Sequence, residues 1–346
     1  MTPLQQHLPW TESPLIINAP MAGFAGGALA SAVTLAGGLG LIGGLFSMED
    51  LKAQLQTASS NISSNTALAS SKTLPVGVGL LPFVLEADNV LPVIQEYKPV
   101  VVWLFAAKTL GDYGVWAAKL RAVSPESKIW IQVGNIAAAL QVAKVAKPDA
   151  ICLQGADAGG HGFEKGAGII SLLPEATDVL AEEGFGGIPL VASGGIVDGR
   201  GVAAALALGA KGVVMGTRFL AADETSVHPK YRAAVLEAKD GGQVTKRSKL
   251  FDQLKGPNMW PEAYDGRSLV VQSHADHVNG VNLEEIQRLH NEEIKGEDAG
   301  FATGLKGRAA IWAGTGVGLV NKVEKAKDIV LGVRGDARNI MSGIAK

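Results

Sequence analysis

The sequence predicts an α/β fold, a (β/α)8 TIM barrel joined to a smaller, mainly helical added domain. Eight short apolar runs each lead into a glycine-marked loop and then into a helical stretch. The runs are rich in Val, Ile and Leu, which is typical of parallel strands buried on both faces. The 346 residues accommodate one barrel of about 250 residues and an added domain.

The strands alternate with helical patterns along the first two thirds of the chain. Strands are expected at residues 15–18, 39–42, 76–80, 100–104, 129–133, 150–153, 189–192 and 212–215. Helical patterns lie between them, for example at residues 26–36, 48–59, 135–145 and 200–208. Eight alternations favour a closed barrel. An open doubly wound sheet is the alternative, because short apolar runs are easily miscounted.

The remaining chain differs in pattern, which predicts three units: a barrel at 1–220, a mainly helical cap at 221–310 and a C-terminal segment at 311–346 that returns to the barrel. The cap region includes a mixed-charge surface helix at 283–295. A Gly-Pro turn lies within residues 255–260, and we expect this segment to act as a lid. The last unit opens with the glycine-rich run 311–318.

Composition excludes several classes of function. Lys and Arg total 31 against 33 Asp and Glu, so the chain has no electrostatic footprint for nucleic acid or an anionic membrane. The one cysteine, Cys152, lies in an apolar run and is expected to be a buried thiol. Neither a secretory signal nor an apolar run of about 20 residues is present. These features predict a cytoplasmic protein with small-molecule partners.

The loops that follow the predicted strands should meet at the carboxyl end of the barrel, where such enzymes place their chemistry. These loops are rich in glycine, glutamine and backbone donors, which is typical of a cofactor rim. The expected rim residues from this pattern include Gln132, Gln154, Gly159, Gly160, Ser193, Gly194 and Gly195.

Two adjacent loops indicate a phosphate site. Ser193, Gly194 and Gly195 follow the seventh predicted strand, and Gly216, Thr217 and Arg218 follow the eighth. Free backbone N–H groups there would bind an anion, with a hydroxyl from Thr217 and added charge from Arg218. A plain loop is the alternative. The dinucleotide-binding fingerprint and the phosphate-binding loop of ATPases are both absent.

His161 is the leading candidate for a catalytic base. It follows the sixth strand among glycines, and its ordinary pKa of about 6.5 suits proton removal at neutral pH. A structural histidine that stabilises the loop is the alternative. Asp157 either orients His161 or stabilises a turn, and the turn is favoured. His274 and His277 lack further ligand-type neighbours, so no metal site is expected.

Four segments in order resemble the nitronate monooxygenase family, formerly called 2-nitropropane dioxygenase. They are residues 18–23 (NAPMAG), 154–162 (QGADAGGHG), 193–196 (SGGI) and 215–219 (MGTRF), and the run at 312–314 (WAG) adds to them. The resemblance implies a flavoprotein with one non-covalent FMN and a monooxygenase reaction. That reaction begins with proton abstraction from a substrate or binding of an alkyl nitronate, and oxygen then yields a carbonyl compound and nitrite.

The family's site residues carry over position by position. The resemblance implies that His161 is the base and that Met21, Ala22 and Gly23 lie along the flavin ring. Gln154 and Gly159 would contact flavin or ribityl atoms. The phosphate would be held by a set of residues from the last two loops, namely Gly195, Val214, Met215, Gly216 and Thr217.

Three positions depart from the family pattern. Gly79 stands where many relatives carry asparagine, Asp157 where they carry glutamate, and Thr315 where glutamine is expected. The first departure removes a contact to flavin or substrate, so the physiological substrate stays open.

Other functions also fit the pattern. The alternatives are an FMN-dependent NAD(P)H:quinone or enoyl-thioester reductase, a non-catalytic barrel that binds a phosphate ligand, and a metal-dependent hydrolase. The oligomeric state is expected to be a monomer or a homodimer.

Overall fold

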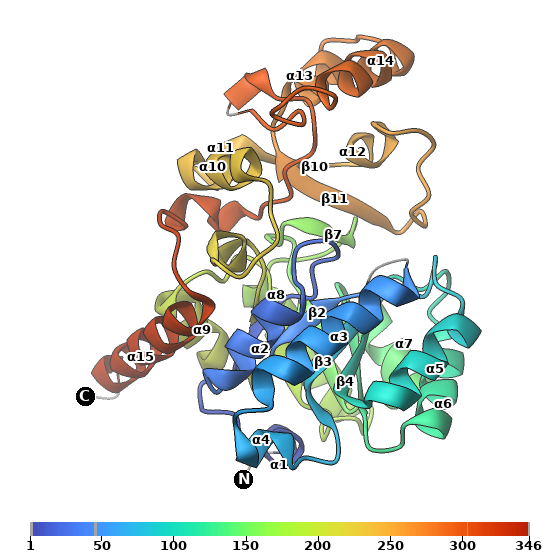
Figure 1. The fold of residues 1–346 in the computed structure, drawn as a ribbon, viewed down its shortest axis with the longest axis vertical. Helices are drawn as coiled ribbons and strands as arrows, with labels where there is room; N and C mark the ends of the chain where they lie inside the picture. The colour runs from blue at the N-terminus through green and yellow to red at the C-terminus, as the bar shows by residue number, and fades with distance from the viewer. Residues whose placement is uncertain (1–2, 45–46, 303, 345–346) are drawn as a thin grey trace.

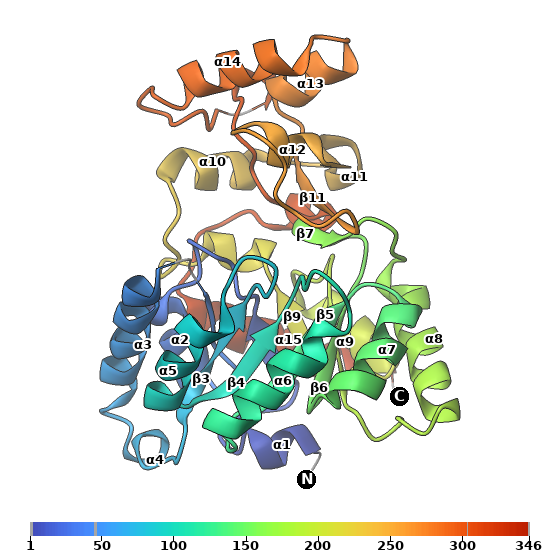
Figure 2. The ribbon, with the colours of Figure 1, turned by 90° about the vertical axis from the view of Figure 1, so that its right-hand side faces the viewer.

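A ring of eight parallel strands forms the lower body of the molecule (Figures 1 and 2). The computed structural model describes residues 3–44, 47–302 and 304–344; residues 1–2, 45–46, 303 and 345–346, which the predicted units include, lie outside this range. All eight predicted strands are confirmed. They are β1 (Ile16–Asn18), β2 (Leu41–Gly43), β3 (Leu74–Leu80), β4 (Pro99–Leu104), β5 (Lys128–Val133), β6 (Ala150–Gln154), β8 (Leu190–Ser193) and β9 (Val213–Met215).

The pairing order closes the sheet into a barrel. Neighbouring strands run β1-β9-β8-β6-β5-β4-β3-β2, all parallel. An isolated parallel bridge between Ile17 and Leu39 then joins the first strand to the chain just before the second. The closed barrel is therefore confirmed, and the open-sheet alternative is excluded.

Helices cover the outside of the ring and position the loops. The helices of the barrel portion are α1 (Pro3–His7), α2 (Gly27–Leu35), α3 (Met48–Ile62), α4 (Thr66–Ala69), α5 (Ala87–Tyr97), α6 (Asp112–Val123), α7 (Ile136–Ala146), α8 (Ile169–Glu182) and α9 (Gly199–Ala207). Several begin at a side chain that caps the first turn: Asn135 accepts from the Ala138 N–H, and Asp198 accepts from the N–H groups of Arg200 and Gly201. These caps set the point where each loop turns into its helix.

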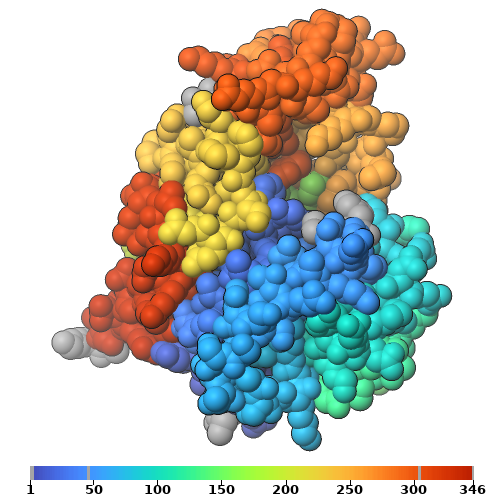
Figure 3. All heavy atoms as spheres, viewed as in Figure 1, coloured from blue at the N-terminus to red at the C-terminus, as the bar shows by residue number. Residues whose placement is uncertain are grey.

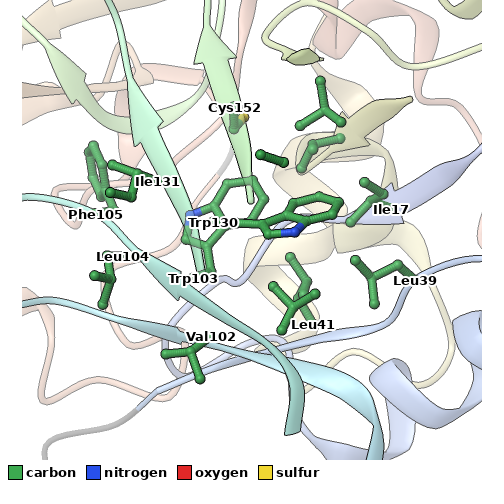
Figure 4. Packing of buried hydrophobic residues seen from close by; sticks show 14 of the residues in the cluster. Ile17, Leu39, Leu41, Val102, Trp103, Leu104, Phe105, Trp130, Ile131 and Cys152 are labelled. Atoms are coloured by element: carbon green, nitrogen blue, oxygen red, sulfur yellow. The ribbon is translucent and has the colours of Figure 1, made fainter. Parts of the chain in front are cut away.

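Two tryptophans fill the middle of the barrel (Figure 4). Trp103 on β4 and Trp130 on β5 are buried, with ring centroids 6.0 Å apart, and Cys152 on β6 lies near them. Side chains two positions apart share a face of a strand, so Gln132 lies beyond Trp130 and Gln154 beyond Cys152 on the inner face. The barrel interior therefore changes from an apolar layer to a layer of amides towards its carboxyl end.

The added part sits over that carboxyl end (Figures 1 and 2). Its helices are α10 (Pro229–Glu237), α11 (Gly241–Val244), α12 (Leu250–Gln253), α13 (Gln272–Val278) and α14 (Leu283–Glu293). Its two strands, β10 (Thr245–Ser248) and β11 (Tyr264–Leu269), form an antiparallel sheet with β7 (Gly160–Phe163). The sequence pattern did not predict this sheet. Through it, β7, a part of the loop after β6, pairs with β11 of the added part.

The chain finally returns to the barrel. The helix α15 (Ala326–Ile344) packs against α9 and α2 and so completes the outer layer of helices. In Figure 3 the red C-terminal segment lies against the yellow segment that contains α10. The 3₁₀ turns η1 (Thr217–Ala221) and η3 (Thr315–Leu319) are in contact there, and a third, η2 (Gly304–Lys306), lies in the added part.

Candidate active site

A cavity of about 310 Å³ lies between the carboxyl ends of the strands and the added part. Its walls come from β5, from the loops after β1, β3, β4, β6, β8 and β9, and from the added part. The lining residues are Ala19, Pro20, Met21, Ala22, Phe24, Leu81, Phe105, Gln132, Gln154, Ala158, Gly159, Gly160, His161, Ser193, Gly194, Gly195, Ile196, Val197, Val214, Gly216, Thr217, Leu220, Tyr231, Trp260, Trp312, Gly314 and Gly316. Segments far apart in the sequence thus form one site.

Nearly every candidate residue from the sequence lines this cavity. The exceptions are Gly23 and Met215. Met215 is fully buried on β9, and Gly23 occupies an exposed turn with a φ of +80°. Both support neighbours that do line the cavity, so any contact they make with a ligand is indirect or at its edge.

His161 stands on β7 at the boundary between barrel and cap. Its ring stacks on the indole of Trp260, with centroids 3.7 Å apart and planes 9° apart, and Trp312 lies at 4.7 Å. Its Nε2 is 2.6 Å from Oδ1 of Asp252 on α12. The imidazole is therefore held by Trp260 on one face and by Asp252 at one edge. A catalytic acid or base must be positioned in this way.

Gln154 links this histidine to the barrel interior. Its amide N–H donates to the His161 carbonyl at 3.0 Å, while its Oε1 is buried and has no partner among the residues described. Gln132 accepts from Trp103 Nε1 at 3.1 Å through its own oxygen. A buried acceptor without a partner is costly, so Oε1 of Gln154 marks a place where a ligand donor is expected.

The glycine pair after β8 forms a cradle. Gly194 and Gly195 have φ values of +103° and +73°, a region that favours glycine. In the loops of the described chain, the backbone N–H groups of Gly195, Gly216 and Thr217 donate to no protein acceptor. Free N–H groups from two adjacent loops can bind an anion.

One predicted contribution to that cradle, the charge of Arg218, is wrong. Arg218 is buried and bonded to Glu324 and the Lys322 carbonyl instead of lining the cavity, because a guanidinium buried there needs a carboxylate partner. The N-terminus of α9 is capped by Asp198, so its first N–H groups are already used. The hydroxyl of Thr217 accepts from the Gly314 N–H at 3.0 Å and keeps its own proton for donation.

Asp157 does not contact His161 in the hydrogen-bond network. Its carboxylate accepts from the Thr315 hydroxyl at 2.9 Å, and its carbonyl accepts from the Thr315 N–H at 3.0 Å. The side chain therefore ties its loop to the returning segment instead of orienting His161 or bonding within its own turn.

The structure adds residues that the pattern did not single out as site residues, among them Asp252, Tyr231 and Phe105. Asp252 lies 91 positions from His161 in an ordinary surface-helix pattern, so no local signal points to it. Tyr231 donates to the Trp312 carbonyl at 3.1 Å, and burial raises the pKa of its phenol far above 10. Tyr231 therefore stays protonated and can act only as a hydrogen-bond donor or wall.

The expectation that Cys152 is a buried thiol is confirmed. Cys152 is fully buried, and desolvation raises the pKa of its thiol, which makes it an inert core residue. No group of three or more metal-ligand side chains occurs in the residues that the structure describes. Over the same residues, no helix is long and apolar enough to cross a membrane.

Solved structures share this architecture along the whole chain. FabK from Thermotoga maritima superposes with a TM-score of 0.75 at 24% identity, covering 100% of this chain and 98% of that one. A nitroalkane oxidase from Streptomyces ansochromogenes superposes with a TM-score of 0.74 at 23% identity, covering 97% of this chain and 99% of that one. The fold thus places the protein in the class of TIM barrels.

Sequence relatives narrow the class further. A family model described as nitronate monooxygenase matches residues 118–333. The nitronate monooxygenase npaC of Metarhizium robertsii is 42% identical over 99% of this chain and 96% of its own length. A nitronate monooxygenase of Neurospora crassa is 36% identical over 98% of this chain and 93% of its own length. The chain belongs to the nitronate monooxygenase family and is a flavin-dependent oxidoreductase.

Proposed function

We propose that the protein uses FMN and oxygen to oxidise alkyl nitronates to a carbonyl compound and nitrite, with His161 as the catalytic base. The observation that carries this proposal is the position of His161. Its imidazole lines the cavity, is stacked on Trp260 and is hydrogen-bonded to Asp252, within the same cavity as the glycine cradle. A positioned imidazole beside a cofactor cradle suits proton abstraction from carbon.

The residues present fit FMN. The free N–H groups of Gly195, Gly216 and Thr217 suit one terminal phosphate, and in the described residues no Lys or Arg lines the cavity. The unpaired Oε1 of Gln154 suits a donor on a flavin ring. One phosphate cradle favours a mononucleotide over a dinucleotide.

The remaining candidates would contact different parts of the cofactor. Met21 and Ala22 would lie along the ring with Gly23 at its edge, and Gln132, Gly159 and Gly160 would contact its polar edge or the ribityl chain. Ser193, Val214 and Met215 would shape the phosphate end. When bound, the flavin supplies the redox chemistry by accepting electrons from the substrate and passing them to oxygen.

His161 would act on substrates that still carry the proton on carbon. A neutral nitroalkane must lose that proton to become a nitronate, and the imidazole accepts it. Aromatic rings of Phe24, Phe105, Trp260 and Trp312 line the cavity, which suits an uncharged alkyl group. Residues 221–310 would serve as the cap that shields this chemistry from water.

The first experiment is a visible spectrum followed by turnover in air. We expect flavin bands, FMN as the cofactor released by heat, and oxygen uptake with nitrite release from a primary nitroalkane and from its nitronate. His161→Asn should keep the flavin bands and lose at least about 100-fold in nitroalkane turnover. His277→Asn, a surface histidine on α13, should behave as wild type.

Other results would redirect the proposal. Flavin without turnover of either nitro compound, but with NADH oxidation by a quinone or an enoyl thioester, would assign the protein to the reductases that share this barrel. A protein that binds no FMN even after reconstitution would refute the proposal as a whole.

A further inference from the structure

We propose that Asp252 is a positioning residue that sets the tautomer of His161. This inference rests on the proposed role of His161 as the base. Oδ1 of Asp252 lies 2.6 Å from Nε2 of His161, a distance typical of a charge-assisted hydrogen bond. If Nε2 carries the proton that Asp252 accepts, the lone pair of the neutral ring is on Nδ1, and Nδ1 is the atom that takes the substrate proton.

The burial of Asp252 favours this role over a purely structural one. Its side chain is only 5% exposed, and Oδ2 is buried without a partner in the described part of the chain. A buried carboxylate that served only the fold would be expected to have both oxygens bonded. Here the side chain has one hydrogen-bond partner, and that partner is His161.

Neighbouring cations are engaged elsewhere. Arg247 pairs with Asp265, and Lys249 pairs with Glu164 at 3.2 Å. Among the described ion pairs, Asp252 appears with His161 alone. The carboxylate is therefore placed to favour the positive charge that His161 gains when it accepts a proton.

The aromatic contacts cannot set the tautomer of His161. Trp260 stacks on the face of the imidazole and Trp312 lies at a tilt of 48°, so both restrict how the ring rotates. A ring face does not choose which nitrogen bears the proton. That choice depends on the hydrogen bond at the edge, which Asp252 provides.

The tautomer can be read directly in the full-length flavoprotein labelled with ¹⁵N-histidine. We would record ring-nitrogen NMR spectra at a pH of about 8.5, where an ordinary histidine is neutral, and assign His161 by its absence in His161→Asn. We expect a protonated Nε2 in wild type and a loss of that preference in Asp252→Asn and Asp252→Ala. A protonated Nδ1 in wild type, or an unchanged spectrum in both variants, would overturn the proposal.

Kinetics separate positioning from folding. Asp252→Asn should lower kcat for a neutral nitroalkane by about 100-fold and change KM little, while turnover of the preformed nitronate is largely kept. Asp276→Asn on α13 is the matched control, because it breaks a 2.6 Å ion pair with Arg308. This variant should leave both activities unchanged. Equal loss with both substrates, or lost flavin, would mean that Asp252 is structural and would overturn the proposal.

The two proposals fail in different ways. If wild type turns over neither nitro compound, the proposed function fails, and the NMR spectra still decide whether Asp252 sets the tautomer. If nitro turnover is present and Asp252→Asn matches wild type in kcat, the assigned role of Asp252 is refuted while the function stands.

Discussion

Two residues that depart from the family pattern meet each other in the structure. Asp157 replaces an expected glutamate and Thr315 an expected glutamine, and their side chains share the 2.9 Å hydrogen bond. Both side chains are shorter than those expected, so the loop and the returning segment approach closely. A Cβ on Gly159 would collide with the backbone of Ala313 and Gly314.

Gly79 also has a steric explanation. A Cβ at this position would collide with the ring of Pro20, which lines the cavity. The asparagine found in relatives would therefore require Pro20 to move. With glycine at position 79, Pro20 of the loop after β1 forms the cavity wall at this point.

Glycine at position 195 is predicted to be essential for the cofactor. Gly195→Ala adds a Cβ to a backbone with φ +73° and places it 3.0 Å from Cβ of Asp157, so the cradle must shift. We expect the ratio of flavin to protein to fall by more than about fivefold, with a strain cost of about 1–2 kcal/mol.

The matched control is Gly209→Ala. Gly209 has a φ of +106° and open space around its Cβ position, away from the cavity. It carries a similar backbone strain and should keep its flavin. Equal flavin content in the two purified variants would show that the Gly194–Gly195 loop does not hold the phosphate.

At the scale of elements, the segment between α12 and β11 covers the site from above. The sequence pattern predicted a lid at residues 255–260, and Trp260 from this segment stacks on His161. Trp260 also lies 4.6 Å from the ring of Phe83, a residue of the loop after β3. The segment thus contacts the barrel rim at two points, the candidate base His161 and the loop after β3.

Removing the indole is expected to weaken catalysis more than binding of the flavin. Trp260→Ala frees one face of His161 and admits water, so kcat/KM for a nitroalkane should fall by about 10-fold or more. Met259→Ala is the control, because Met259 is 72% exposed. Steady-state kinetics that match wild type in Trp260→Ala would argue against a lid.

At the scale of the whole molecule, one buried arginine joins the two ends of the chain. Arg334 on α15 is 1% exposed and donates to the carbonyls of Pro14, Ala36 and Gly37 at 3.2, 2.9 and 2.7 Å. It therefore fastens the last helix to the start of β1 and the end of α2. The ring of helices depends on this contact between segments about 300 positions apart.

Loss of this guanidinium should destabilise the fold. Arg334→Met leaves the carbonyls of Pro14 and Ala36 without this donor and that of Gly37 with the Glu12 N–H alone, so we expect a loss of about 3 kcal/mol and a Tm lower by several degrees. Arg338→Met, one turn further along α15 and 51% exposed on its side chain, should cost under about 1 kcal/mol. Equal Tm values for both variants in a thermal scan would show that Arg334 does not stabilise the contact between the last helix and the start of the barrel.

The sequence by itself determined the barrel and most of the site, because both depend on local patterns. Buried parallel strands are read from short Val, Ile and Leu runs, and a backbone cradle needs glycines such as Gly194 and Gly195 at that point of the chain. The loops after such strands converge whatever their sequence separation. The position of His161 at the carboxyl end of the barrel therefore follows from the sequence pattern.

Only the tertiary structure decided which groups act on His161. Asp252 and Trp260 reach it through an antiparallel sheet that pairs β7 with β11, and strand pairing across about 100 residues leaves no local periodicity to read. The same holds for Arg218, whose expected phosphate role was displaced by Glu324 from the returning segment. Long-range burial selects the partner of each charge, and that selection is absent from any short stretch of sequence.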